Sequence, residues 1–284
     1  MRIVCLIEDT EGTERTQGTN GCAAAHGLSF YVETGAHKLL VDLGPSDETL
    51  KNAEKMGIDL RDVDTVVLSH GHYDHSGGIM PFVRRNKKAK IYMQKTAVGD
   101  FYSDDGESAE ERYRYIGIDP EIADLPQVVF VDGDFRIDDE LELFTVKHGS
   151  HAIPFTNKSL LVRNGSGYAE DSFDHEHYLV IHDEERHILV SGCAHKGMPN
   201  IMEAYFGKYN AAPDIAISGF HLMKKTDYSE EEKWEIAEIA GQLNEYPTRY
   251  FTCHCTGIKA YEIMKGVMGD KLTYVHSGGE ILRD

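Results

Sequence analysis

Three histidines and one aspartate lie within a segment of six residues, and their spacing could hold metal ions. His70 and His72 are two residues apart, so an extended backbone would direct both imidazoles to the same side. Asp74 follows in phase with them, and His75 comes directly after it. Catalytic metal sites use imidazoles and carboxylates and leave one position open to water, whereas structural zinc sites use closed, thiolate-rich sets. The segment therefore predicts a catalytic metal centre.

Four ligands in so short a segment are more than a single tetrahedral ion readily accepts. Two divalent ions about 3.5–4 Å apart would account for their density. We expect zinc, and manganese or iron would suit the same donor atoms. A solvated histidine-rich loop without metal is the alternative. The apolar run 65–68 before the segment and the glycine pair 77–78 after it favour the metal centre.

The run H-G-H-Y-D-H at residues 70–75 resembles the H-x-H-x-D-H signature of the metallo-β-lactamase superfamily. The segments 27–34 (GLSFYVET), 191–195 (SGCAH), 217–222 (ISGFHL) and 252–257 (TCHCTG) resemble one branch of that superfamily. The branch includes 7,8-dihydropterin-6-methyl-4-(β-D-ribofuranosyl)aminobenzene-5′-phosphate synthases and metal-dependent hydrolases. The resemblance implies an α/β fold of the metallo-β-lactamase type, an αββα sandwich of two mixed sheets with helices on the outer faces.

Four predicted strands end in segments that carry histidines. The strands cover residues 65–68, 187–190, 214–218 and 248–252, and they are followed by the segment 70–75, His195, His221 and His254. In α/β sheets, functional sites lie outside the carboxyl ends of the strands. We therefore expect the four segments to serve one site.

The resemblance adds His195 and His254 to the metal ligands, so the expected ligands are His70, His72, Asp74, His75, His195 and His254. It is compatible with one ion bound by His70, His72 and His195 and a second bound by Asp74, His75 and His254. Asp74 would also accept a hydrogen bond from the attacking water, and His221 would polarise or protonate the leaving group. We expect Asp74 and His221 to be the catalytic residues.

The chain has five cysteines, an odd number that indicates thiols in a reducing compartment rather than a disulfide framework. Cys193 is either a buried thiol behind the site or a thiolate ligand. Cys253 and Cys255 flank His254 and would point away from it in an extended chain, either as packing groups or as groups that contact the metal ligands from behind. A redox pair of these two cysteines is the alternative.

The roles of the other polar residues are open or structural. His148 and His151 either contact the site or lie in a surface loop. We expect a mostly surface position for four further histidines: His175, His177, His182 and His187. Asp42 ends a predicted strand and either supports the metal ligands from behind or caps a turn.

The composition limits the partners. The 284 residues carry 48 acidic and 29 basic side chains, a net charge of −19, and the only basic cluster lies at residues 84–88. We therefore expect no nucleic-acid partner. No apolar run is long enough to span a membrane and the first residues lack the pattern of a signal peptide, so we expect no membrane partner and a cytoplasmic location. The expected partner is a small-molecule substrate. If it is anionic, the metal ions would attract it despite repulsion by the net negative charge of the protein. A homo-oligomer is compatible with the sequence.

We expect one domain over residues 1–284, with strands and helices in alternation. The acidic and aromatic segment 95–125 interrupts this pattern. It is either a helical, cap-like insertion that covers the site or a solvated excursion. Its tyrosines need a packing partner and favour the cap.

Three functions remain open. The first is a metal-dependent hydrolase that uses a metal-bound water or hydroxide on a small ester, thioester or phosphoester, because coordination lowers the pKa of water from about 15.7 to about 7. The second is a transferase that joins a dihydropterin to a ribofuranosyl-aminobenzene phosphate on the same metal site. The third is a non-catalytic, metal-dependent small-molecule binding protein. We expect the hydrolase.

Overall fold

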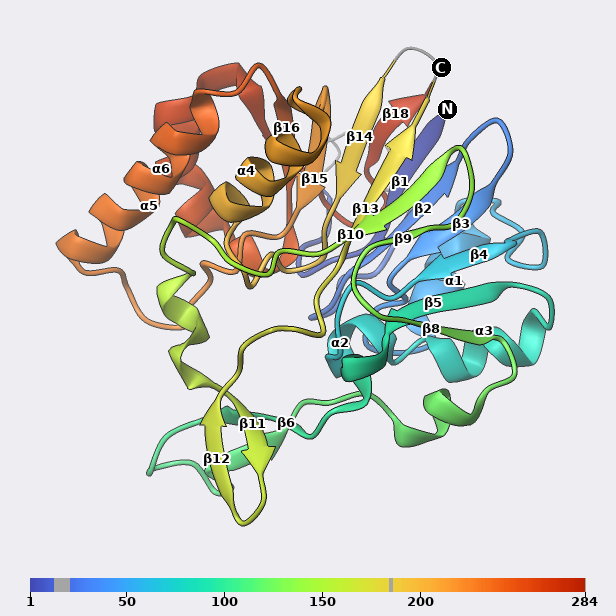
Figure 1. The fold of residues 1–284 in the computed structure, drawn as a ribbon, viewed down its shortest axis with the longest axis horizontal. Helices are drawn as coiled ribbons and strands as arrows, with labels where there is room; N and C mark the ends of the chain where they lie inside the picture. The colour runs from blue at the N-terminus through green and yellow to red at the C-terminus, as the bar shows by residue number, and fades with distance from the viewer. Residues whose placement is uncertain (13–20, 184–185, 284) are drawn as a thin grey trace. The chain divides into compact units, whose positions relative to one another are not determined.

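The computed structural model describes residues 1–12, 21–183 and 186–283 (Figure 1). The chain forms two compact units, each assembled from separate parts of the sequence. Unit 1 comprises residues 1–133, 157–177 and 276–284, and unit 2 comprises residues 134–156 and 178–275. The expected strands and helices are present in both units.

Unit 1 contains a seven-stranded mixed sheet. Its order is β18 (Glu280–Arg283), β1 (Arg2–Ile7), β2 (Ser29–Glu33), β3 (Lys38–Val41), β4 (Thr65–Val67), β5 (Lys90–Gln94) and β8 (Val128–Val131). The strands from β18 to β3 are antiparallel, whereas those from β3 to β8 are parallel. Parallel neighbours need crossover connections, which α1 (Glu48–Lys55) and α3 (Ile79–Arg85) provide around β4.

One apolar row explains why these helices cover the sheet. Cross-strand pairing aligns Val4, Tyr31, Leu40, Val66 and Ile91 on adjacent strands. The row shares one buried cluster with apolar residues of both helices, namely Leu50, Ala53, Ile79, Phe82 and Val83. Burial of this row against α1 and α3 holds β3 and β4 side by side. The carboxyl end of β4 leads to residues 70–75, the predicted metal-binding segment, and that of β3 leads to Asp42.

A second, four-stranded sheet in unit 1 contains two strands from the segment 95–125. Its order is β12 (Gly167–Glu170), β11 (Leu160–Asn164), β6 (Phe101–Asp104) and β7 (Tyr113–Tyr115). Two short 3-10 helices, η1 (Lys95–Val98) and η2 (Pro120–Asp124), flank the strands of the segment. The expectation of a helical insertion was therefore wrong. Aromatic residues pack well across strands, and Tyr102 faces Tyr115 with ring centroids 5.4 Å apart.

Unit 2 contains another seven-stranded mixed sheet. Its order is β17 (Leu272–Tyr274), β16 (Arg249–Thr252), β15 (Ile215–Ser218), β14 (His187–Val190), β13 (Tyr178–His182), β10 (Leu141–Phe144) and β9 (Phe135–Arg136). The strands from β14 to β17 are parallel and the others antiparallel. The connections between the parallel strands contain α4 (Met198–Tyr209), α5 (Glu230–Asn244) and α6 (Ile258–Met268).

The unit 2 sheet is also covered along a single row. Val180, Leu189, Ala216, Tyr250 and Leu272 are paired across five adjacent strands. They share a buried cluster with residues from all three helices, including Ile201, Met202, Ile236, Leu243 and Met264. The row fixes the strands in register, so that the loops after β14, β15 and β16 leave the sheet at the same edge. In the described part of the chain, no helix is both long and apolar enough to cross a membrane.

Candidate metal centre

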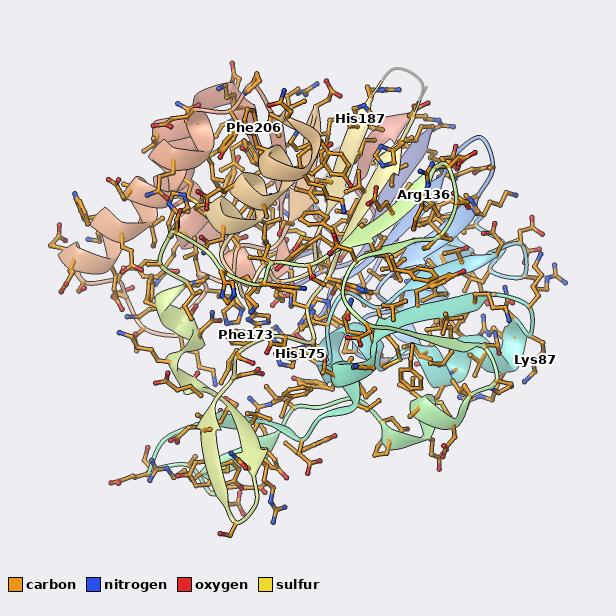
Figure 2. The ribbon with its side chains drawn as sticks, viewed as in Figure 1. Lys87, Arg136, Phe173, His175, His187 and Phe206 are labelled. Atoms are coloured by element: carbon orange, nitrogen blue, oxygen red, sulfur yellow. The ribbon has the colours of Figure 1, made fainter. Side chains whose placement is uncertain are left out.

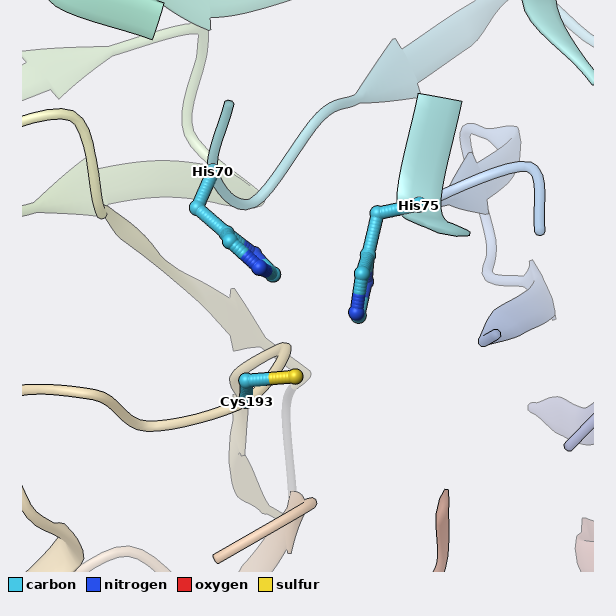
Figure 3. A group of neighbouring side chains, drawn as sticks. All are labelled: His70, His75 and Cys193. Atoms are coloured by element: carbon cyan, nitrogen blue, oxygen red, sulfur yellow. The ribbon is translucent and has the colours of Figure 1, made fainter. Parts of the chain in front are cut away.

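The metal-binding segment of unit 1 begins where β4 ends. His70 lies in the bend after the strand, and His72 has an extended backbone (φ −106°, ψ 149°). A single helical turn, α2 (Tyr73–Ser76), carries Asp74 and His75. The ring centroid of His70 lies 4.6 Å from that of His72 and 4.2 Å from that of His75. Figure 3 shows the rings of His70 and His75 extending into the same space. The structure thus brings the three expected imidazoles of this segment together.

A buried carboxylate behind the segment orients two of these rings. Nδ1 of His75 donates to Oδ2 of Asp42 over 2.6 Å. Ser69 donates its hydroxyl to the same oxygen over 2.7 Å, and Nδ1 of His70 lies 2.8 Å from that hydroxyl. Both imidazoles therefore carry the proton on Nδ1, and Nε2 is the nitrogen that would bind a metal. Of the two roles open to Asp42, the structure shows the supporting one.

His72 is held in the neutral form that a metal ligand requires. Burial, together with the neighbouring His175, lowers the pKa of His72 to about 3, although the charge of Asp74 acts in the opposite direction. A neutral imidazole offers a lone pair at physiological pH, whereas a protonated one must lose its proton before it binds a metal.

Asp74 lies beside a histidine that the sequence did not single out. Oδ2 of Asp74 is 3.8 Å from Nε2 of His75 and 3.6 Å from Nε2 of His26. The other ring nitrogen of His26 lies 2.8 Å from Oδ2 of Asp9. Both His26 and Asp9 belong to a long polar loop without periodicity, of which residues 13–20 lie outside the described chain. In the sequence, the only sign of a function in this loop is its length.

Two histidines expected at the surface are buried behind the metal-binding segment. His175 is 1% exposed and lies beside Phe173, with ring centroids 6.0 Å apart (Figure 2). Its Nδ1 accepts a hydrogen bond from the backbone N–H of Gly71 over 3.0 Å, and its Nε2 lies 3.0 Å from Oδ2 of Asp171. A surface position for His175 was therefore wrong, because the ring provides the backbone partner that the loop needs.

His177, two residues after His175, also forms hydrogen bonds to the backbone near the metal-binding segment. Its Nε2 donates to the carbonyl oxygen of Leu68 over 2.8 Å, and its backbone N–H donates to Ser69 over 2.9 Å. Burial lowers its pKa to about 4. The expected surface position was wrong here as well. The other two histidines agree better with expectation, since His187 is exposed and His182 is partly buried.

In unit 2, three loops bring the expected residues to the carboxyl ends of β14, β15 and β16. Gly219 donates its N–H to the carbonyl of Gly192 over 2.8 Å, and Leu222 donates to the carbonyl of Cys255 over 2.9 Å. Each loop is thus hydrogen-bonded to the next. Each also contains one non-glycine residue in the left-handed region: Ala194 (φ 51°), His221 (φ 47°) and His254 (φ 50°). Such strain is characteristic of functional sites.

These turns gather histidines and cysteines inside unit 2. The ring centroids of His195 and His221 are 4.2 Å apart. Potential ligand atoms of Cys193, His195 and His221 lie within 4.8 Å of one another, and so do those of Cys193, His254 and Cys255. Cys193 projects from the loop after β14 (Figure 3). Unit 2 therefore presents two overlapping groups of metal-binding side chains that share Cys193.

The expectation that Cys255 points away from His254 was wrong. The chain is not extended there, because His254 has a positive φ and residues 254–256 form a 3-10 turn. Burial opposes ionisation of the Cys255 thiol. Hydrogen bonding with Cys193 and the proximity of His254 and His221 nevertheless lower its pKa well below the usual value. Cys253 is buried, as a packing residue would be.

The loop after β10 contains the two histidines whose roles were open. His148 is exposed, and His151 is partly buried with its backbone N–H donating to Oδ1 of Asn200 over 2.8 Å. The same asparagine donates to the carbonyl of His151 over 2.9 Å. These backbone contacts hold the loop against α4 and leave the roles of both side chains open.

A family model described as the metallo-beta-lactamase superfamily matches residues 24–230. The chain belongs to this superfamily. The predicted α/β fold of the metallo-β-lactamase type and the resemblance on which it was based are thereby confirmed. The solved structure of Tm1679, described as a metal-dependent hydrolase of the β-lactamase superfamily, aligns with a TM-score of 0.80 and 30% identity over 100% of this chain and 99% of its own.

Two proteins similar to this chain come from Methanocaldococcus jannaschii. The uncharacterized protein MJ0448 is 28% identical over 242 residues, which are 84% of this chain and 86% of that protein. The 7,8-dihydropterin-6-methyl-4-(β-D-ribofuranosyl)-aminobenzene-5′-phosphate synthase is 23% identical over 274 residues, 89% of this chain and 88% of its own. The similarity therefore extends over most of the chain in both cases.

The donor atoms in both units suit a divalent ion. Neutral imidazole, carboxylate and thiolate are the side chains that bind zinc. In unit 1, Asp42 fixes the rings of His70 and His75 from behind, as outer-shell carboxylates do for metal-ligating histidines. The chemistry of these residues therefore fits the divalent metal binding expected of a superfamily member.

Proposed function

We propose that this superfamily member is a metal-dependent hydrolase that acts on a small ester, thioester or phosphoester. The observation that supports it most is the hydrogen bonding behind the metal-binding segment. Asp42 accepts a hydrogen bond from His75 and another from the hydroxyl of Ser69, which in turn contacts His70. This arrangement fixes two imidazoles with the same nitrogen as the donor. Similarity to the hydrolase Tm1679 over the whole chain gives further support.

We propose two divalent ions, with zinc first and manganese or iron as alternatives. The proposed ligands are His70, His72, Asp74 and His75 of unit 1, and His195 and His254 of unit 2. The ligands of unit 1 are supported by their mutual geometry, and those of unit 2 by their strained positions at strand ends.

Bound divalent ions would acidify a water molecule and so supply a nucleophile at neutral pH. The carboxylate of Asp74 would accept a hydrogen bond from that water and orient it. His221 would polarise or protonate the leaving group. Its ring lies at the end of β15 beside that of His195, with ring centroids 4.2 Å apart.

The proposed substrate is a small molecule, and the proposed location is the cytoplasm. The five cysteines all lie in the described chain and all carry thiols rather than disulfides, which suits a reducing compartment. The net charge of −19 gives no support to a nucleic-acid substrate.

A transferase is the second candidate, favoured by the similarity to the dihydropterin-aminobenzene phosphate synthase over 89% of this chain. In that case the same residues would act while the pyrophosphate ester of a dihydropterin is joined to a ribofuranosyl-aminobenzene phosphate, with pyrophosphate as the leaving group. Incubation with both co-substrates, followed by mass spectrometry of the products, separates this reaction from hydrolysis.

The decisive experiment is turnover by protein purified without chelator, after its metal content has been measured. Generic esters, thioesters and phosphodiesters should be hydrolysed, and activity should be lost with chelator and restored by zinc, manganese or iron. Asp74→Asn should lower kcat by about 10²–10⁴-fold. The control is Asp139→Asn, which changes a fully exposed carboxylate. Tight ligand binding without turnover under any of these metals would instead indicate a non-catalytic binding protein and contradict both enzymatic proposals.

A further inference from the structure

Two cysteine side chains of unit 2 occupy positions that packing alone does not explain. Cys193 and Cys255 come from different loops, after β14 and β16, yet their sulfurs and a ring nitrogen of His254 lie within 4.8 Å of one another. All three side chains are buried. Two thiols and one imidazole at this separation match the mixed ligand sets of zinc sites.

The backbone of unit 2 is shaped around the sulfur of Cys255. The backbone N–H of His221 donates to this sulfur over 3.3 Å. A Cβ atom at Gly219 would lie only 2.5 Å from the same sulfur, so the residue at 219 must be glycine for Cys255 to fit. The loop after β15 therefore provides both a hydrogen-bond donor and the space for a sulfur atom.

The backbone conformation of His254 places the side chains of His254 and Cys255 on the same side of the chain. With φ at 50°, this residue breaks the alternation of an extended chain, so that consecutive side chains at 254 and 255 can reach one point. A non-glycine residue in this region is strained and is maintained only where the surroundings enforce it. A cysteine that merely filled space could do so without this strain.

We propose that the thiolates of Cys193 and Cys255 and the imidazole of His254 bind one divalent metal ion. The inference rests on the proposed function, because this ion would be one of those that the hydrolase uses. Three protein ligands leave a coordination position open, as in catalytic zinc sites. Thiolate ligands favour zinc over manganese or magnesium, which prefer oxygen donors, so the ligand set also selects the metal.

X-ray absorption at the zinc edge tests the ligand set without any substitution. The zinc-loaded wild-type protein should show sulfur at about 2.3 Å in addition to nitrogen and oxygen at about 2.0–2.2 Å. Bound zinc surrounded only by nitrogen and oxygen would overturn the thiolate ligands and leave the proposed hydrolase intact. Failure to bind any divalent ion would contradict the inference and the proposed function together.

Substitution gives a second, independent measurement. Cys193→Ser and Cys255→Ser should each weaken zinc affinity by at least about tenfold, since even outer-shell changes cost about 10–100-fold. Each should also reduce the near-ultraviolet thiolate-to-metal band of the cobalt-substituted protein. Cys22→Ser, at a buried thiol of unit 1, should change neither. Unchanged affinity and an unchanged band in both variants would refute the inference, as would a Cys193–Cys255 disulfide found by mass spectrometry in the active protein.

Discussion

Oδ2 of Asp42 lies 2.6 Å from Nδ1 of His75, and both side chains are essentially inaccessible to solvent. The contact fixes the tautomer of a ring that is proposed to bind metal. The same oxygen accepts a hydrogen bond from Ser69, whose hydroxyl contacts His70. One carboxylate directly after β3 thus orients two imidazoles that follow the neighbouring strand β4. A buried carboxylate in this position is useful only if the rings must point in fixed directions.

Asp42→Asn should therefore weaken metal binding. The amide keeps the shape of the carboxylate and tolerates the positive φ of this residue (60°), so the fold should persist. It removes the charge that favours a proton on Nδ1 of His75, and we expect the affinity for zinc to fall about 10–100-fold in a competition titration with a chelator. The matched control is Asp62→Asn, at an exposed carboxylate of the same unit. Equal affinities in the two variants would show that Asp42 does not orient the rings.

His175→Ala should lower the free energy of unfolding. The substitution leaves the N–H of Gly71 and the carboxylate of Asp171 buried without their common partner, and each such group costs about 1–3 kcal/mol. The measurement is urea unfolding of the metal-free protein. His187→Ala, at the exposed end of β14, should change stability by less than about 0.5 kcal/mol. If the variant lost metal affinity but kept the wild-type free energy of unfolding, the ring would position the loop without stabilising it.

Part of this site could be predicted from the sequence, because the patterns that indicate it lie within short segments of the chain. The segment 70–75 places its ligands within one turn of chain, so residue spacing alone indicated the metal-binding chemistry. The strand ends before His195, His221 and His254 were also predictable, because β14, β15 and β16 are short runs rich in β-branched and aromatic residues. Their observed ranges lie within one residue of the predicted ones.

The errors arose where long-range contacts or an unusual φ decide the structure. His175 and His177 belong to a polar stretch typical of a solvated loop, and only the hydrogen-bonding needs of residues more than 100 positions away make them buried. The direction of Cys255 was wrong because no sequence pattern predicts a left-handed histidine at 254. Local patterns therefore predicted the proposed ligands in unit 1, whereas the groups that position them could be found only in the structure.

Stability of the metal-free protein should fall as the pH is lowered from about 6.5 to 4. The pKa of His177 is about 4 in the folded protein, and its usual value is near 6.5. In this range the unfolded chain binds the proton and the folded chain does not, so the free energy of unfolding rises with pH. The shift corresponds to about 3 kcal/mol for this residue. His72, with its pKa lowered to about 3, adds to the same slope.

The contribution of His177 can be isolated with His177→Gln, whose amide can still donate to Leu68 but does not titrate. Urea unfolding at a series of pH values, with chelator present, should give a shallower dependence for this variant than for the wild type. His187→Gln provides the control for an exposed histidine and should retain the wild-type slope. Parallel curves for the wild type and His177→Gln would assign the acid sensitivity to other groups.

Gly219→Ala should destabilise unit 2 and weaken metal binding together. The new methyl group would lie 2.5 Å from the sulfur of Cys255, which must move away from Cys193 and His254. Overpacking of this kind costs about 1–3 kcal/mol. The matched control is Gly207→Ala in α4, where an added methyl meets no atom within 4 Å. That variant should be stabilised by about 0.5–1 kcal/mol, because alanine is the better helix residue. Thermal unfolding and zinc titration of both variants provide the comparison, and normal zinc affinity in Gly219→Ala would show that the position of the Cys255 sulfur is immaterial to the metal.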